Sequence, residues 1–365
     1  MGSPCWTFLC PESVKVFNRE LAKSASTYLR YRVHFFDFLV ATSPAFIHDL
    51  DVVGMSTLFF YTSCTLTKSV APPPHLCARE LPQGSVLERQ AEWCSRIDAW
   101  KGERRMAREL YAGGHWSVVR GFASARPSLR CFVISAGYGL VSIDTRLAPY
   151  AATFAFGHPD SVARSLGKNA PEENVAWWNA LCNWRPAGEK GVRSICGSLM
   201  RARTGIHVFA LSASYLDAIS EDLARGRQQL ADPGRLIIVS TGRARHDHLN
   251  GNVIPAPAEL QTLLGGGLVS LNVRVAAEAV NSISVSDLTF EEVRKFVCEL
   301  ASRAKPRVYP KRCPTSDEEI TSFIRKAARE ERKPSYTNLL RSFRHSGRAC
   351  EIKRFRTLFQ KTLTK

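Results

Sequence analysis

Four short apolar segments, separated by helical patterns, constrain the fold of this chain more than any other feature of its sequence. Each segment is rich in β-branched or aromatic side chains, as buried strands are. The segments are Thr57–Thr62, Arg130–Ser135, Ile206–Leu211 and Arg235–Ser240. Alternation of strands with helices is typical of a parallel or mixed sheet with helices on both faces. We therefore predict an α/β fold.

The helical patterns fill the gaps between these strands and follow the last one. The predicted helices are Val86–Trp100, Arg104–Ala125, Val175–Trp184, Ala213–Leu230 and Thr289–Arg303. The last begins with a capping box formed by Thr289 and Glu292. In open α/β sheets, ligands bind beyond the carboxyl ends of the strands. A functional site is therefore expected in the loops that follow the strands.

Positive charge is concentrated in the last sixth of the chain. Of 50 Lys+Arg and 33 Asp+Glu residues in the 365-residue sequence, 17 and 6, respectively, lie from Lys305 onward. The Pro-rich stretch Lys305–Pro310 resembles a linker. We therefore predict an apolar helical segment at residues 1–54, an α/β domain at 55–304 and a basic module at 305–365.

The cysteine and hydropathy patterns argue against a zinc-binding protein and against a membrane-spanning helix. The 11 cysteines form no CxxC pair and no cluster with zinc-finger spacing. No run of about 18 apolar residues is present. We expect a cytoplasmic protein with reduced thiols, no contact with a membrane, no metal ion and no cofactor.

The basic module has the pattern of three short amphipathic helices. A capping box at Ser316 begins the first, Pro334 precedes the second, and a turn at His345–Gly347 precedes the third. This order resembles a helix-turn-helix core. The cations that we expect to bind the phosphates of DNA or RNA are Arg325, Lys326, Arg329, Arg341, Arg344, Arg348, Lys353, Arg354 and Arg356. Alternatively, this basic face docks on an acidic patch of another protein.

Two loops of the α/β domain carry candidate ligand-binding residues. After the first strand, Ser63, Cys64 and Lys68 offer backbone amides, hydroxyl and thiol groups and an ammonium, which suit an anion or a carbonyl group. After a Gly-Gly pair, His115 and Trp116 offer rings that could stack on a base. The alternatives are an ordinary strand exit and a structural turn.

A third loop, after the second strand, resembles the wall of a site. A buried strand runs there into Gly-Tyr-Gly and then to a carboxylate and a Pro-Tyr pair. The residues assigned to this wall are Ser135, Gly137, Tyr138, Gly139, Asp144 and Tyr150. Small residues would leave space and the two tyrosines would offer planar contacts. The alternative role for Asp144 is to cap the next turn.

Taken together, these segments resemble the YaaA-like superfamily over residues 57–240. The resemblance rests on Cys64 and Lys68 after the first strand, and on four short motifs. These motifs are ARELYxG at Ala107–Gly113, SAxYGL at Ser135–Leu140, PYxxTF at Pro149–Phe154 and LSxxY at Leu211–Tyr215. The resemblance implies a role with DNA or RNA. Proteins of this group are associated with DNA binding and oxidative stress, with 7-deazaguanine modification of tRNA, and with phage and antiviral defence gene clusters.

Two functions remain open at this point. The first is an enzyme that modifies or exchanges a nucleobase. Asp144 would then serve as the catalytic carboxylate, Lys68 as an anion or carbonyl contact, and Tyr138 as a wall around the base. The second is a non-catalytic DNA- or RNA-binding or scaffolding subunit of a multiprotein defence or repair system.

Overall fold

The computed structural model describes residues 57–165, 169–186, 191–241, 247–307, 311–330 and 335–363. The predicted segment 1–54 lies outside the described residues, as do residues 308–310 of the predicted linker. All four predicted strands are confirmed to within one residue at either end, as β1 (Leu58–Ser63), β3 (Arg130–Ser135), β6 (Ile206–Leu211) and β7 (Leu236–Ser240).

The main sheet is mixed, which confirms the predicted α/β class. Two further strands complete it, β4 (Gly139–Ser142) and β8 (Val253–Pro255), and the order is β4-β3-β1-β6-β7-β8. All neighbouring pairs are parallel except β3 and β4. Every residue of β1, β6 and β7 is buried. Both faces of these strands are covered, and for this reason their sequences are continuous apolar runs.

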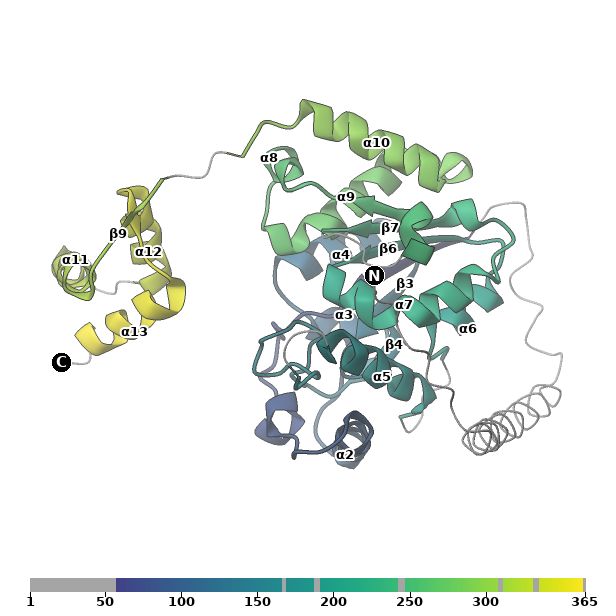
Figure 1. Cartoon of the computed structure of the whole chain (residues 1–365), viewed down its shortest axis with the longest axis horizontal. Coiled ribbons are helices and arrows are strands. Elements are labelled where there is room, and N and C mark those ends of the chain that lie inside the picture. Colours follow the sequence, from purple (N-terminus) through teal and green to yellow (C-terminus); the bar gives the residue numbers. More distant parts are fainter. Residues whose placement is uncertain are drawn as a thin grey trace, which may run out of the picture. The chain divides into compact units, whose positions relative to one another are not determined.

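Helices cover the two faces of this sheet (Figure 1). On one side lie α4 (Gly114–Ser124), α9 (Leu271–Ser282) and α10 (Phe290–Arg303), and on the other α5 (Ala170–Asn183), α6 (Ile195–Arg201) and α7 (Ala213–Arg227). The other α-helices among the described residues of the domain are α2 (Val86–Ala99), α3 (Ala107–Leu110) and α8 (Gln261–Leu264). The predicted capping bond of α10 is present, because the Thr289 side chain accepts from the Glu292 amide.

The predicted helix Arg104–Ala125 is wrong. The segment contains β2 (Arg105–Met106), α3 and α4, and β2 pairs with β5 (Arg146–Leu147) in a separate two-stranded ladder. The interruption between α3 and α4 includes Gly113, whose φ of +89° lies outside the α-helical region. Helix α4 therefore begins anew at Gly114, and its amino end is free to take part in a site.

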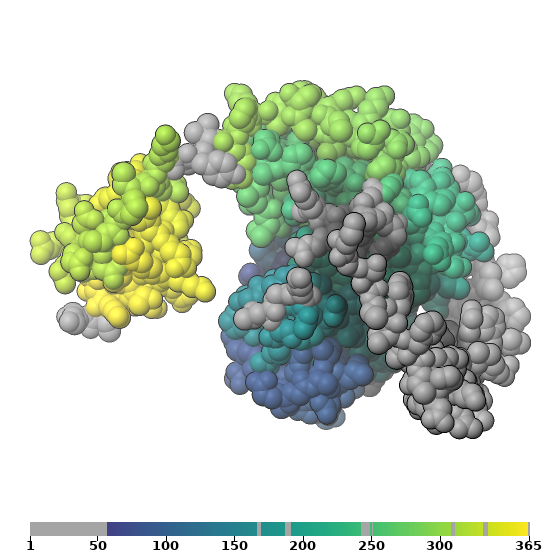
Figure 2. All heavy atoms as spheres, in the orientation of Figure 1, coloured from purple at the N-terminus to yellow at the C-terminus, as the bar shows by residue number. Residues whose placement is uncertain are grey.

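The described part of the basic module contains three helices, as predicted. They are α11 (Asp317–Glu330), α12 (Tyr336–His345) and α13 (Ile352–Leu363), joined by a short parallel ladder of β9 (Cys313–Pro314) and β10 (Arg348–Ala349) that was not predicted. Their apolar faces form a core separate from that of the α/β domain, centred on Ile320, Phe343 and Phe355. Figure 2 shows the side chains of this module gathered into one body. Its likeness to a helix-turn-helix stays a prediction.

Among the described residues, no single helix is long and apolar enough to cross a membrane. The segments Ala258–Leu264 and Leu268–Ser282 together have the length and the apolar composition of a span, but a bend of 86° separates them.

Candidate functional site

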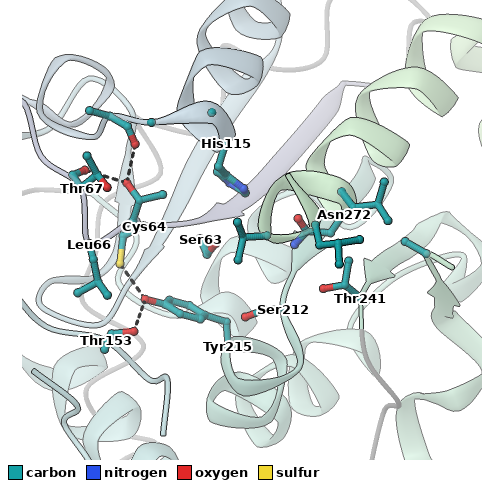
Figure 3. A pocket seen from close by; sticks show the side chains of 18 of the residues that line it. Ser63, Cys64, Leu66, Thr67, His115, Thr153, Ser212, Tyr215, Thr241 and Asn272 are labelled. Atoms are coloured by element: carbon teal, nitrogen blue, oxygen red, sulfur yellow. Dashed lines mark hydrogen bonds between the residues drawn. The ribbon is translucent and has the colours of Figure 1, made fainter. Parts of the chain in front are cut away.

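A pocket of about 600 Å³ lies at the carboxyl ends of β1 and β6. At this position the direction of the chain connections reverses, because β1 connects toward β3 on one side and the chain later returns to β6 on the other. Ligands of open α/β sheets bind at such switch points. The pocket is lined by Ser63–Thr67 after β1 and by residues at the amino ends of three helices: Gly113–His115 of α4, Ser212 and Tyr215 of α7, and Leu271 and Asn272 of α9 (Figure 3).

The lining of this pocket is a largely apolar surface with uncharged polar groups set into it. Among the described residues that line it, there is no Asp, Glu, Lys or Arg. The polar groups are hydroxyls, one thiol, one imidazole and one carboxamide, set among small and apolar side chains. Such a surface binds an uncharged polar ligand, or a single anionic group held by backbone amides.

Cys64 contributes a thiol to the pocket wall. It follows β1 directly and is only 4% exposed. Its Sγ lies 3.1 Å from the Tyr215 hydroxyl, which in turn lies 3.5 Å from Thr153 Oγ1 (Figure 3). The thiol therefore belongs to a hydrogen-bonded chain that connects the loop after β1 with α7.

His115 connects three elements around the pocket. It lies in the first turn of α4, and its Nε2 is 2.6 Å from Thr62 Oγ1 of β1. A hydrogen bond also joins the ring to the backbone of Val269. Burial lowers the pKa of His115 to about 4, although the bond with Val269 opposes this shift. The ring is therefore neutral at pH 7, and it holds the amino end of α4 against β1.

Lys68 does not line the pocket, in contrast to its predicted role as an anion contact. Backbone pairing with Tyr111 turns it away after the Thr65–Thr67 loop. Its ammonium donates to the Thr65 carbonyl and lies 4.8 Å and 4.5 Å from the ring centres of Tyr111 and Tyr150. Burial lowers the pKa of Lys68 to about 8, while nearby Cys64 and Asp160 oppose the shift. Its main contacts are thus with the protein itself.

Asn272 is a pocket residue that the sequence analysis missed. It lies at the start of α9, is 2% exposed, and its Oδ1 accepts from the Val273 amide. Within the described part of the chain, its Nδ2 donates to no partner, and Figure 3 shows this amide directed into the pocket. The sequence offered only a weak signal, a Gly-rich stretch at Gly265–Gly267 shortly before an apolar helix.

Asp144 lies at the opposite edge of the sheet, which contradicts its predicted place in the site wall. Strand β4 runs antiparallel to β3, so that Ser142 lies opposite Phe132 near the amino end of β3. Asp144 follows in the next turn, where its 58% exposed side chain pairs with Arg108 at 3.1 Å. The carboxylate is therefore carried away from the carboxyl edge, where the pocket lies.

The Gly-Tyr-Gly segment and Tyr150 form core packing and not a ligand-binding wall. Tyr138 and Tyr150 are at most 1% exposed, and their rings pack edge to face at 5.3 Å. The Tyr150 hydroxyl lies 2.6 Å from Ser135 Oγ, and a Cβ at Gly137 would lie 2.5 Å from the Tyr150 ring. Gly139, with φ of +71°, makes the turn from β3 into β4. The pattern therefore encodes a tight turn over a buried ring.

Of the second predicted loop, only part reaches the pocket. His115 lines it, but Trp116 is fully buried against Tyr111, with ring centres 4.7 Å apart. Its Nε1 has no hydrogen-bond partner among the residues that the structure describes. Together with Ser63 and Cys64, His115 is thus one of the predicted residues that the structure brings to one site.

The cations of the basic module fall into two groups. In the first, Arg344 donates to the Cys350 carbonyl, Arg348 lies over the Phe343 ring at 4.3 Å, and Arg354 pairs with Asp317 at 2.6 Å. The second group is exposed and forms no ion pair with any residue in the described ranges; its members are Arg325, Lys326, Arg329, Arg341, Lys353 and Arg356. Of these, Arg356 also lies over the Tyr336 ring, 5.6 Å from its centre.

No group of three or more His, Cys, Asp or Glu side chains suited to a metal ion occurs among the described residues.

No family model, curated protein or solved structure matches the chain. The resemblance to the YaaA-like superfamily therefore stays a prediction that rests on the sequence motifs.

Proposed function

We propose that this is a nucleic-acid-associated protein, in which the basic module binds the backbone of DNA or RNA and the pocket of the α/β domain takes up a nucleobase. The observation that carries the proposal is a set of exposed cations that pair with no carboxylate in the described part of the chain, on a module with its own apolar core. Phosphates neutralised by such cations release counterions, which supplies binding that does not depend on base sequence.

The distribution of charge within the module favours α12 and α13 as the contact surface. Neither helix contains an acidic residue, and they carry Arg341, Lys353 and Arg356 on exposed positions. Helix α11, by contrast, begins with three acidic residues and ends with Glu330. A phosphate backbone would be repelled by part of α11, but by no side chain of α12 or α13.

The pocket supports the second half of the proposal. A nucleobase is uncharged, planar and rich in hydrogen-bond donors and acceptors, which matches a pocket lined by hydroxyl, imidazole and carboxamide groups. The motifs shared with the YaaA-like superfamily favour the same class of ligand, and extend the proposal to base modification, including 7-deazaguanine chemistry, in antiviral defence. Asp144 could not serve as the catalytic carboxylate of a reaction in this pocket, because it lies at the other edge of the sheet.

Two matched triple variants of the full chain test nucleic-acid binding. The first removes three charges from α12 and α13, and the second removes three from α11. They are Arg341→Gln/Lys353→Gln/Arg356→Gln and Arg325→Gln/Lys326→Gln/Arg329→Gln. Affinity for a 20-base-pair DNA duplex and for a hairpin RNA is measured against salt concentration by fluorescence anisotropy.

We expect the α12/α13 variant to lose at least tenfold in affinity, and the α11 variant to lose less. For B-DNA each lost phosphate contact lowers the salt slope by about 0.9, so the first variant should lower it by about 3. Equal affinity of the wild-type chain and both variants would refute the proposal. Failure of the wild-type chain to bind any polynucleotide, together with co-purification of an acidic protein, would favour the scaffolding alternative.

A further inference from the structure

The amino end of α4 presents backbone donors to the pocket. The first bond within this helix runs from the Ser117 amide to the Gly113 carbonyl, at 3.0 Å. The preceding amides, from Gly114 to Trp116, donate to none of the described residues, and no side chain caps the helix. Such uncapped donors, together with the helix dipole, favour an anion.

Two glycines leave this helix end open. Gly113 takes a backbone conformation with φ of +89°, and a Cβ at Gly114 would meet no atom within 4 Å. A ligand can therefore approach the backbone without contact from side chains at these two positions. Helix α4 has no acidic residue in its first turn that would occupy or repel the site.

Asn272 is an independent sign of a ligand at the same pocket. The Val273 amide fixes its Oδ1, so that the other end of the carboxamide, Nδ2, faces the cavity as a donor (Figure 3). This donor reaches the surface of the cavity and has no acceptor among the described residues. A ligand oxygen in the cavity would supply the acceptor that this donor lacks.

These donors have a common requirement, which is a ligand group that offers acceptors and negative charge. No carboxylate among the described lining residues would repel such a group. A volume of about 600 Å³ has room for a base, a sugar and one phosphate. Resting on the proposed function, we infer that the pocket binds a nucleoside monophosphate unit, with its phosphate at the amino end of α4 and in reach of the Asn272 amide.

The test compares ligands with and without the phosphate on the full chain. Isothermal titration calorimetry measures binding of the four nucleoside 5′-monophosphates and of the four corresponding nucleosides. We expect at least one monophosphate to bind tenfold or more tightly than its own nucleoside. Equal affinities of each pair, or no binding of any monophosphate, would overturn the inference.

Substitutions at Gly114 locate the phosphate. Gly114→Pro removes one free N–H at a helix position that accepts proline, whereas the matched control Gly114→Ala keeps the N–H and adds a methyl in open space. Loss of one charge-assisted bond should weaken monophosphate binding about tenfold in the proline variant, with nucleoside affinity retained. The alanine variant should bind like wild type. Unchanged monophosphate binding in a folded Gly114→Pro protein would overturn the inference.

A charge change at Asn272 gives a second location test. Asn272→Asp keeps the oxygen that accepts from Val273 but replaces the donor with a negative charge, and should weaken monophosphate binding more than tenfold. Asn281→Asp makes the same change at an exposed position of α9, outside this pocket, and should leave binding unchanged. Equal effects of the two substitutions would overturn the inference.

The inference and the proposed function can fail separately. Nucleoside binding with no gain from the phosphate would overturn the inference and leave the base pocket standing. Monophosphate binding at Gly114 by a chain that binds no polynucleotide would support the inference and overturn the proposed role of the basic module.

Discussion

A methyl group added at Gly137 should destabilise the protein substantially, if the Gly-Tyr-Gly turn is core packing. The Cβ of Gly137→Ala would lie 2.5 Å and 2.6 Å from two ring atoms of Tyr150, so the buried ring must move by about 1 Å to restore ordinary contact. Overpacking of this kind costs about 1–3 kcal/mol. Movement of the ring also strains the bonds of its hydroxyl to Ser135 and Tyr111, at 2.6 Å and 2.8 Å, for about 1 kcal/mol more. We expect a total loss of about 2–4 kcal/mol.

The matched control is Gly121→Ala in the interior of α4. A Cβ at Gly121 would meet no atom within 4 Å, and alanine favours a helix over glycine by about 1 kcal/mol. Urea unfolding followed by circular dichroism should therefore show changes of opposite sign for the two substitutions. In thermal unfolding, Gly137→Ala should lower the midpoint by about 4–16 °C. A Gly137→Ala protein as stable as wild type would refute the packing argument.

Three further predictions concern charged and titratable groups. Asp144→Asn should change the unfolding free energy by less than about 1 kcal/mol, because the ion pair of Asp144 with Arg108 is exposed. It should leave nucleotide binding intact, because Asp144 lies away from the pocket. A loss of binding in calorimetry would contradict our placement of the site. Burial lowers the pKa of His115 and of His207 to about 4, so between pH 6.5 and pH 4 the unfolded chain binds protons that the folded protein does not. The unfolding free energy should therefore fall as the pH drops through this range. His207→Gln should reduce this fall in urea titrations, and an unchanged pH dependence would contradict the prediction. Burial lowers the pKa of Lys68 to about 8, so between pH 8 and pH 10.5 this amine is protonated in the unfolded chain but not in the folded protein. The unfolding free energy of wild type, relative to that of Lys68→Met, should therefore rise over this range. A constant difference would exclude a desolvated ammonium.

Local sequence patterns predicted the elements of this protein well where a single periodicity governed a segment. The four apolar runs became β1, β3, β6 and β7 because strands covered on both faces need no polar alternation. Three helices of the basic module followed from apolar spacing and capping residues. The prediction of one long helix at Arg104–Ala125 was wrong, because Gly113 in this segment has a φ of +89°. Glycine permits this conformation, but its presence in a sequence does not show that the chain adopts it.

The candidate site was only partly predictable, and the reason is topological. Ser63, Cys64 and His115 were found because they follow β1 or a Gly-Gly pair, which are local signals. The position of Asp144 was predicted wrongly, because no local pattern shows that β4 turns back antiparallel to β3. Asn272 was missed because it meets the loop after β1 and the amino end of α4, both distant in sequence, only in the folded chain.

The sequence alone thus determined the class of fold, the positions of four of the five parallel strands and the concentration of positive charge at the carboxyl end. The tertiary structure decided the order of the strands, and with it the edge of the sheet at which each loop lies. Strand order depends on contacts between distant segments, which no local periodicity encodes. For this reason the pocket at β1 and β6, and the helix ends that meet there, emerged only from the folded chain.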